Sequence, residues 1–273
     1  MRSCSTVRSS TRALPQVIGA SSILNALFTV TAAVLGAAGL ARGLTIRQLI
    51  VVAAIMNAAV ALYIYRLVPE FLLRFVCWLL VHILYRLQRP CGANRFPEHG
   101  AALIVSNHVS FVDALVISAA CRRPIRFIMD EAIFNAPIIR ALAKGMKAIP
   151  IASAKDDEVI LEQAFEMTAA ALRDGELVCI FPEGRLTRDG KIGTFRPGMM
   201  RILDETPVPV VPIAIVGLWG SMFSRLAARV WQRLPRKLGA RISVNVSEPL
   251  NPHDVSPDRL RTCVQALYDR HGR

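Results

Sequence analysis

A run of apolar residues without a single charged side chain extends from Val17 to Ala41. About 20 such residues are enough to cross the hydrocarbon core of a bilayer. A second run, QLIVVAAIMNAAVALYIY, lies between Arg47 and Arg66 and has the length expected of a spanning helix. The two runs predict a transmembrane hairpin over residues 1–66. Two buried core helices or a cleaved signal peptide are the weaker interpretations.

Composition agrees with a chain that is partly in lipid, since 53% of its residues are hydrophobic although only 7% are aromatic. Arginines precede the first run and follow the second, which favours the cytoplasm for both ends of the hairpin. We therefore expect a protein of the inner (plasma) membrane whose C-terminal domain is cytoplasmic. The flanking arginines are Arg2, Arg8 and Arg12 before the first run, Arg42 and Arg47 in the turn, and Arg66, Arg74 and Arg86 after the second.

Residues 67–89 form a third apolar stretch, but Glu70, Arg74 and His82 interrupt it. These side chains would be costly at the centre of a bilayer. The stretch predicts an interfacial helix that leads into the C-terminal domain.

A net charge of +13 raises the question of nucleic acid, but no basic surface interleaved with aromatic residues is present. Residues 224–241 instead place Arg225, Arg229 and Arg233 at four-residue steps beside apolar positions. This pattern predicts a basic amphipathic helix, either lying on the membrane or packed on the core. We expect membrane lipid, and not nucleic acid, as the partner.

From residue 90 onward, short β-rich runs alternate with helical ones, which predicts an α/β domain over 90–273 with a mainly parallel sheet covered by helices. The cysteines show no pairing or spacing typical of a metal site. The expected strands are 101–106, 125–129, 147–152, 176–181, 209–216 and 241–246, and the expected helices are 156–173 and 257–271.

Two ionisable groups follow the first of these strands. His108 comes just after Asn107, and Asp113 stands five positions later in the first turn of a helix that we expect to begin near Phe111, capped by Ser110. A carboxylate bound to one imidazole nitrogen fixes the tautomer and makes the other nitrogen a better base. The pair is a candidate catalytic base and its orienting group. By spacing alone, a capping aspartate and a surface histidine are the favoured interpretation, because H-x-x-x-x-D is a weak pattern.

A second polar group follows the strand 176–181. The loop FPEGR presents Phe181, Pro182, Glu183, Gly184 and Arg185 at what we expect to be the same edge of the sheet. Arginines and loop amides bind phosphate groups, and a glycine lets the backbone approach them. A charged turn in solvent is the alternative.

Together, N-H-x-x-x-x-D and F-P-E-G-R resemble blocks of the glycerolipid acyltransferase family, and VVPIAI at 210–215 is similar to a further block. Two departures stand out. KAIPIA at 147–152 lacks the arginine of many relatives, and Arg185 follows Gly184 directly where phosphatidate-forming relatives have Thr and then Arg. These departures are closer to the acyltransferase part of bacterial lysophospholipid transporter/2-acylglycerophosphoethanolamine acyltransferase fusions. The hairpin would then be a transporter-like remnant, with a possible transporter partner.

The resemblance implies the glycerolipid acyltransferase fold and an acyl transfer without cofactor or metal. The donor would be acyl carrier protein or acyl-coenzyme A, and the acceptor a lysophospholipid. His108 would be the general base and Asp113 its orienting group. The residues Asn107, Phe181, Pro182, Glu183, Gly184 and Arg185 would bind substrate. The alternatives are a lysophosphatidate acyltransferase, a hydrolase, and a non-catalytic membrane remnant of a transporter fusion.

Overall fold

The computed structural model describes residues 5–67, 69–88, 91–153, 156–221 and 239–271. The chain divides into two compact units, Met1–Leu67 and Val68–Arg273. Each unit is described by itself below. The predicted basic helix of residues 224–241 lies outside the described residues, apart from its last three positions.

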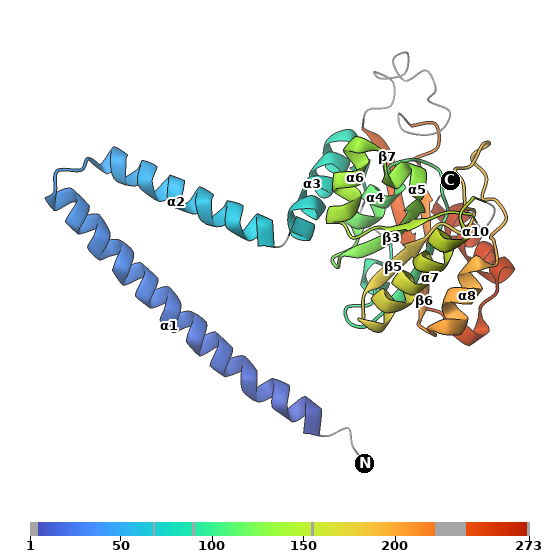
Figure 1. Cartoon of the computed structure of the whole chain (residues 1–273), viewed down its shortest axis with the longest axis horizontal. Helices are drawn as coiled ribbons and strands as arrows, with labels where there is room; N and C mark the ends of the chain where they lie inside the picture. Colours follow the sequence, from blue (N-terminus) through green and yellow to red (C-terminus); the bar gives the residue numbers. More distant parts are fainter. Residues whose placement is uncertain (1–4, 68, 89–90, 154–155, 222–238, 272–273) are drawn as a thin grey trace. The chain divides into compact units, whose positions relative to one another are not determined.

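The first unit consists of two helices, α1 (Ser5–Ala41) and α2 (Ile46–Leu67), drawn in blue in Figure 1. Ser22–Ala41 and Ile46–Ile64 are long and apolar enough to cross a membrane. Thr45 and Gln48 fix the start of α2 as a capping box, because the Gln48 side chain accepts from Thr45 N at 2.8 Å and Thr45 Oγ1 accepts from Gln48 N at 3.3 Å. The predicted pair of apolar helices is confirmed.

The second unit begins with α3 (Pro69–Leu84), which is followed directly by the short strand β1 (Tyr85–Leu87). The helix predicted over 67–89 therefore ends earlier, at Leu84. Tyr85 is 3% exposed and pairs with Ala240 of β7, so packing and strand pairing override the helical pattern of the preceding residues.

Seven strands form one sheet with the order β1-β7-β6-β2-β5-β3-β4. The central strands β6, β2, β5, β3 and β4 are mutually parallel, and only the β6–β7 pairing is antiparallel. This confirms the predicted mainly parallel sheet. The other strands are β2 (Ala102–Ser106), β3 (Ile125–Asp130), β4 (Ile149–Ile151), β5 (Leu177–Ile180), β6 (Val210–Val216) and β7 (Ala240–Val246).

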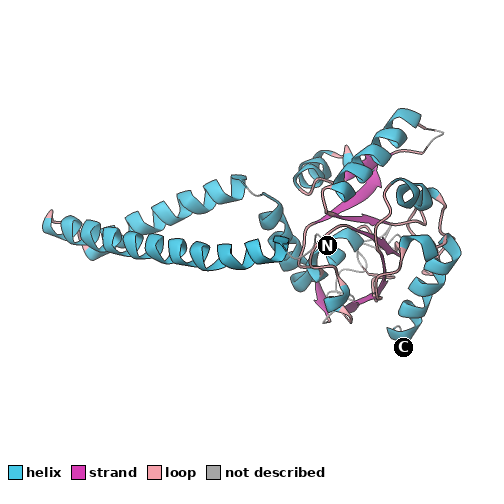
Figure 2. Ribbon diagram, turned by 90° about the horizontal axis from the view of Figure 1, so that it is seen from below, coloured by secondary structure: helices cyan, strands magenta, loops and turns pink. Residues whose placement is uncertain are grey.

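Helices cover both faces of this sheet (Figure 2). Alternate residues of the strands point to opposite faces. In β2, Ile104 packs in the cluster that contains the α3 and α4 side chains, whereas Leu103 and Val105 pack with α7, α8 and α10. Within the described residues, the other helices are α4 (Asp113–Ala120), α5 (Glu131–Phe134), α6 (Pro137–Gly145), α7 (Glu158–Arg173), α8 (Gly198–Glu205) and α10 (Pro257–His271), with 3₁₀ turns at Ala93–Arg95 and Pro252–Asp254.

Candidate active site

The two polar segments meet at one edge of the sheet. β2 and β5 are parallel neighbours, and Val105 pairs with Ile180, so the chain leaves both strands at the same level. The residues that follow are Asn107 and His108 on one side and Phe181 on the other. Thr187 N donates to the His108 carbonyl at 2.9 Å, which joins the FPEGR loop to the histidine segment. The expectation that His108 and this loop share an edge is confirmed.

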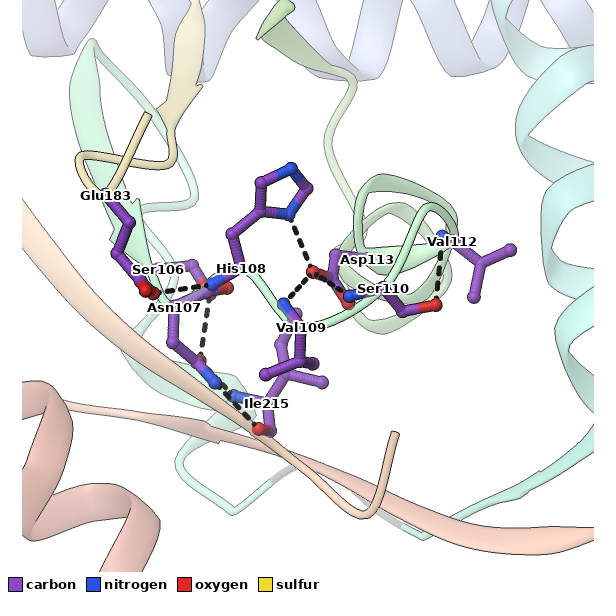
Figure 3. Close-up of polar contacts among 9 residues, drawn as sticks. All are labelled: Ser106, Asn107, His108, Val109, Ser110, Val112, Asp113, Glu183 and Ile215. Atoms are coloured by element: carbon purple, nitrogen blue, oxygen red, sulfur yellow. Dashed lines mark hydrogen bonds and ion pairs between the residues drawn. The ribbon is translucent and has the colours of Figure 1, made fainter. Parts of the chain in front are cut away.

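His108 and Asp113 are in direct contact (Figure 3). His108 Nδ1 lies 2.8 Å from Asp113 Oδ2. Because a carboxylate only accepts, Nδ1 carries the hydrogen and the lone pair is on Nε2. The His108 side chain is 24% exposed, whereas that of Asp113 is fully buried. The imidazole is therefore partly accessible, while the carboxylate that contacts it is shielded from water.

A tight turn holds the Asp113 carboxylate in place. Oδ2 also accepts from the backbone N–H groups of Val109 at 2.7 Å and Ser110 at 2.9 Å. Asp113 is the first residue of α4, so the helix starts two positions after the predicted Phe111. Burial raises the pKa of the Asp113 carboxyl, and the hydrogen bonds from His108 and the two amides offset part of that rise.

Phe181 fixes the plane of the His108 imidazole. The rings of His108 and Phe181 stack with centroids 4.3 Å apart and an angle of 17° between their planes. Phe127 of β3 lies behind Phe181, with centroids 6.5 Å apart. Ring stacking and the Asp113 hydrogen bond together restrict both rotations of the histidine side chain.

Glu183 lies inside the site, between the two segments. Its Oε1 accepts from His108 N at 2.9 Å and its Oε2 from Gly193 N at 2.9 Å, and the residue is 6% exposed. Burial raises the pKa of Glu183, which these two backbone amides partly offset. The sequence predicts Glu183 as a substrate-binding residue. In the structure its two oxygens accept from the backbone of two protein segments, at His108 and at Gly193.

Asn107, like Glu183, is buried and uses its side chain to join two segments of the backbone. Its side-chain amide donates to Ile215 O at 3.1 Å and accepts from Ile215 N at 2.8 Å, and the residue is fully buried. The side chain thus extends the ladder between β2 and β6 by one more pair of bonds. It holds the start of the His108 segment against β6, within the block predicted at 210–215.

The FPEGR loop and the residues just after it carry arginines on the protein surface. Arg185 and Arg188 are exposed, while Leu186 between them is buried. Gly184 has a φ of 63°, in the left-handed region, and a Cβ at that position would lie 2.9 Å from the Arg196 guanidinium carbon. The arginine therefore covers the space that the missing side chain leaves.

Arg196 is a residue that sequence analysis missed. Its backbone N donates to Pro182 O at 2.9 Å, so the segment after Gly193 runs beside the FPEGR loop. Arg196 is exposed and adds a third guanidinium to Arg185 and Arg188. The only signal was an arginine flanked by Phe and Pro, eleven positions after Arg185, and nothing local to the sequence brings the two together.

The region that contains these two blocks is similar to known proteins. Residues 90–216 match the Acyltransferase family. A probable 1-acyl-sn-glycerol-3-phosphate acyltransferase of Mycoplasma pneumoniae is 31% identical over 160 residues, which cover 56% of this chain and 58% of that protein. The chloroplastic 1-acyl-sn-glycerol-3-phosphate acyltransferase LPAT1 of Arabidopsis thaliana is 31% identical over 129 residues, covering 46% of this chain and 35% of the plant protein.

A solved structure shares the fold. The 1-acyl-sn-glycerophosphate acyltransferase of Thermotoga maritima superposes with a TM-score of 0.53 at 21% identity, covering 71% of this chain and 72% of that one. The chain spans less than two thirds of the length of the two curated relatives. The expected similarity to glycerolipid acyltransferases is confirmed at the level of family and fold.

Proposed function

We propose that this protein is a membrane-bound O-acyltransferase, since residues 90–216 match the Acyltransferase family. It moves a fatty acyl group from a thioester donor to the free hydroxyl of a lysophospholipid. The observation that carries this proposal is the 2.8 Å contact between His108 Nδ1 and the buried Asp113 carboxylate, on an imidazole that is still partly exposed.

His108 acts as the general base in this reaction. Its Nε2 removes the proton from the acceptor hydroxyl as the oxygen attacks the thioester carbonyl. The tetrahedral intermediate then expels the thiolate, which takes the proton back from the imidazolium, and a diacyl lipid and a free thiol remain. A base of this kind contributes typically about 10² to 10⁴ in rate. Asp113 stabilises the imidazolium that forms in between.

The exposed arginines Arg185, Arg188 and Arg196 bind the phosphate of the acceptor. Guanidinium groups suit phosphate oxygens because they donate two parallel hydrogen bonds. The printed names of the relatives favour 1-acylglycerol 3-phosphate as the acceptor. Arg185 directly follows Gly184, where phosphatidate-forming relatives have Thr and then Arg, and this departure favours another lysophospholipid, such as lysophosphatidylethanolamine, as the second candidate.

The hairpin of α1 and α2 anchors the enzyme in the inner (plasma) membrane, with the catalytic domain in the cytoplasm. Two helices of spanning length and the arginines that flank them support this arrangement. Protease added to sealed right-side-out vesicles is expected to leave the catalytic domain intact, and to digest it in inverted vesicles. The transporter-like character of the hairpin stays a prediction.

The test is an acyl transfer assay on the full chain in detergent micelles. Radiolabelled acyl-coenzyme A and acyl carrier protein thioesters are each offered with lysophosphatidate, lysophosphatidylethanolamine and no acceptor. Wild type is expected to move label into diacyl lipid with at least one pair. His108→Ala is expected to lower kcat by about 10² to 10⁴.

Two results would overturn the proposal. Release of label only as free fatty acid would indicate a hydrolase. Equal, background-level rates for wild type and His108→Ala across the whole panel would indicate a non-catalytic membrane protein. His99→Ala is the matched control, because His99 is exposed and belongs to neither block.

A further inference from the structure

A pocket that is partly open to solvent lies at the edge of the sheet away from His108. Arg126 at the start of β3, Lys147 before β4 and Glu176 before β5 line it. His108 and Phe181, by contrast, follow the ends of β2 and β5. Since these strands are parallel, the pocket and the acyl transfer site are at opposite ends of the sheet.

The lining of this pocket is positively charged. Four cationic side chains contribute to it, from Arg74, Arg123, Arg126 and Lys147, against the single carboxylate of Glu176. This carboxylate already pairs with one of the four cations, because Arg126 Nη2 donates to Glu176 Oε1 at 2.7 Å. Arg74 and Arg123 leave an excess of positive charge that attracts an anion.

Neither Arg123 nor Arg74 is neutralised by a carboxylate within the described residues, but their contacts differ. The Arg123 guanidinium donates to the carbonyls of Pro97, Gly100 and Gly175, at 3.0, 2.7 and 2.7 Å. These neutral acceptors fix the guanidinium without cancelling its charge. Arg74 of α3 also lines the pocket and, within the described part of the chain, makes no ion pair with a carboxylate.

A buried hydroxyl in the same lining also points to a ligand. Ser118 of α4 is 4% exposed, and its Oγ has no hydrogen-bond partner among the residues that the structure describes. Buried hydroxyls normally find a partner, and a helical serine commonly bonds to a carbonyl one turn back. A cation and a hydroxyl donor facing one pocket are the groups that bind phosphate oxygens.

We propose that this pocket binds the phosphate group of an anionic membrane phospholipid, separately from the acyl transfer site. The position of Arg74 in the chain favours a lipid over a free anion. Its helix α3 begins at Pro69, two residues after α2 ends at Leu67. The same helix exposes large apolar side chains, namely Phe75 (57%), Trp78 (44%), Leu79 (41%) and Ile83 (64%).

A helix with such a surface, attached to a spanning helix, is suited to the boundary between head groups and acyl chains. Arg74 is therefore within reach of lipid head groups. Apolar side chains of Pro124, Ile125 and Met146 also line the pocket and can contact the glycerol and the first methylenes of the lipid. Pocket charge, the unpaired hydroxyl and apolar walls together match a phospholipid better than a small hydrophilic anion.

Native mass spectrometry of the full chain in a neutral detergent tests the proposal. Phosphatidylglycerol and phosphatidylcholine are added in parallel titrations. Wild type is expected to retain one phosphatidylglycerol with at least about tenfold preference over phosphatidylcholine, because only the former carries a net negative charge. Arg74→Gln and Ser118→Val are each expected to weaken retention of phosphatidylglycerol by about tenfold.

Arg140→Gln is the matched control, because it removes the same charge from an exposed position of the neighbouring helix α6. His108→Ala separates this inference from the proposed function, since it is expected to lose acyl transfer and to retain the lipid as wild type does. Thermal unfolding gives a second measurement. Phosphatidylglycerol is expected to raise the Tm of wild type and Arg140→Gln more than that of Arg74→Gln.

Three results would overturn the inference. The first is equal retention of the two lipids by wild type. The second is retention by Arg74→Gln and Ser118→Val that matches the Arg140→Gln control. The third is full displacement of phosphatidylglycerol by millimolar inorganic phosphate, which would make the site one for a free anion.

Discussion

The Glu183 carboxylate joins His108 to Gly193, since each of its oxygens accepts one backbone N–H of these two residues at 2.9 Å. The two bonds hold the histidine segment against the loop that carries Arg196. Glu183 therefore positions His108, the proposed base, through the main chain while its own side chain stays buried.

Replacing Glu183 by Gln is expected to lower stability and kcat together. A glutamine offers one oxygen and one NH₂ group, so one buried backbone N–H loses its acceptor. Such a loss costs about 1–3 kcal/mol. Thermal unfolding and steady-state kinetics check this, with the exposed Glu98→Gln as control. A raised KM for the acceptor with unchanged stability would instead indicate that Glu183 contacts substrate.

The stability of the protein is expected to depend on pH through Glu183. Burial raises its pKa above the ordinary 4.5. Between pH 4.5 and the raised pKa, Glu183 is protonated in the folded protein and ionised in the unfolded chain. The free energy of unfolding therefore falls as pH rises through this window, and the loss is complete above the raised pKa.

Glu183→Gln removes this titration, so its Tm is expected to fall less steeply than that of wild type as the pH rises above 4.5, the ordinary pKa of a glutamate. Asp113 also has a raised pKa and contributes a slope of the same sign. The slope in the variant is therefore reduced and not abolished. A slope as steep as that of wild type would contradict the contribution of Glu183.

Asp113→Asn is expected to lower kcat by about 10² or more while the protein stays folded. The asparagine oxygen can still accept from Val109 N and Ser110 N, so the turn before α4 keeps its bonds. The negative charge that stabilises the imidazolium is lost. The double variant with His108→Ala is expected to be no slower than His108→Ala alone, because the two side chains act as a unit.

The exposed Asp174→Asn serves as control for Asp113→Asn, as it removes a carboxylate at the end of α7. Additive losses in the double variant would show that Asp113 acts on catalysis by a route other than His108.

Gly184→Ala is expected to destabilise the protein by about 1–2 kcal/mol, since its φ of 63° is unfavourable for alanine. The new Cβ would also lie 2.9 Å from the Arg196 guanidinium carbon and displace that side chain. We expect a higher KM for the phosphate-bearing acceptor and an unchanged KM for the donor. Arg196→Ala in the Gly184→Ala background should then cause little further change in acceptor KM.

Gly198→Ala is the matched control for this substitution. Nothing lies within 4 Å of a Cβ at Gly198, and the residue begins α8 with an ordinary backbone conformation. Alanine there is expected to leave activity unchanged and to keep or slightly raise stability. An equal loss of acceptor binding in both glycine variants would contradict the specific role of Gly184.

The sequence by itself determined the features that depend on nearby residues. Charge-free runs of spanning length specified the two apolar helices, and alternation of short apolar runs specified the central strands to within one or two residues. His108 and Asp113 are five positions apart, so a single turn is enough to bring them together.

Tertiary structure alone decided what residues distant in the sequence do to one another. Asn107 pairs with Ile215 across 108 positions and Glu183 with His108 across 75, so only the sheet order makes them internal supports of the site. Tyr85 became a strand residue because β7 lies beside it. Arg196 lies beside the FPEGR loop, and Arg74 and Ser118 line one pocket, through packing that no local pattern encodes. Side-chain periodicity records which face of an element is buried and not which element covers it.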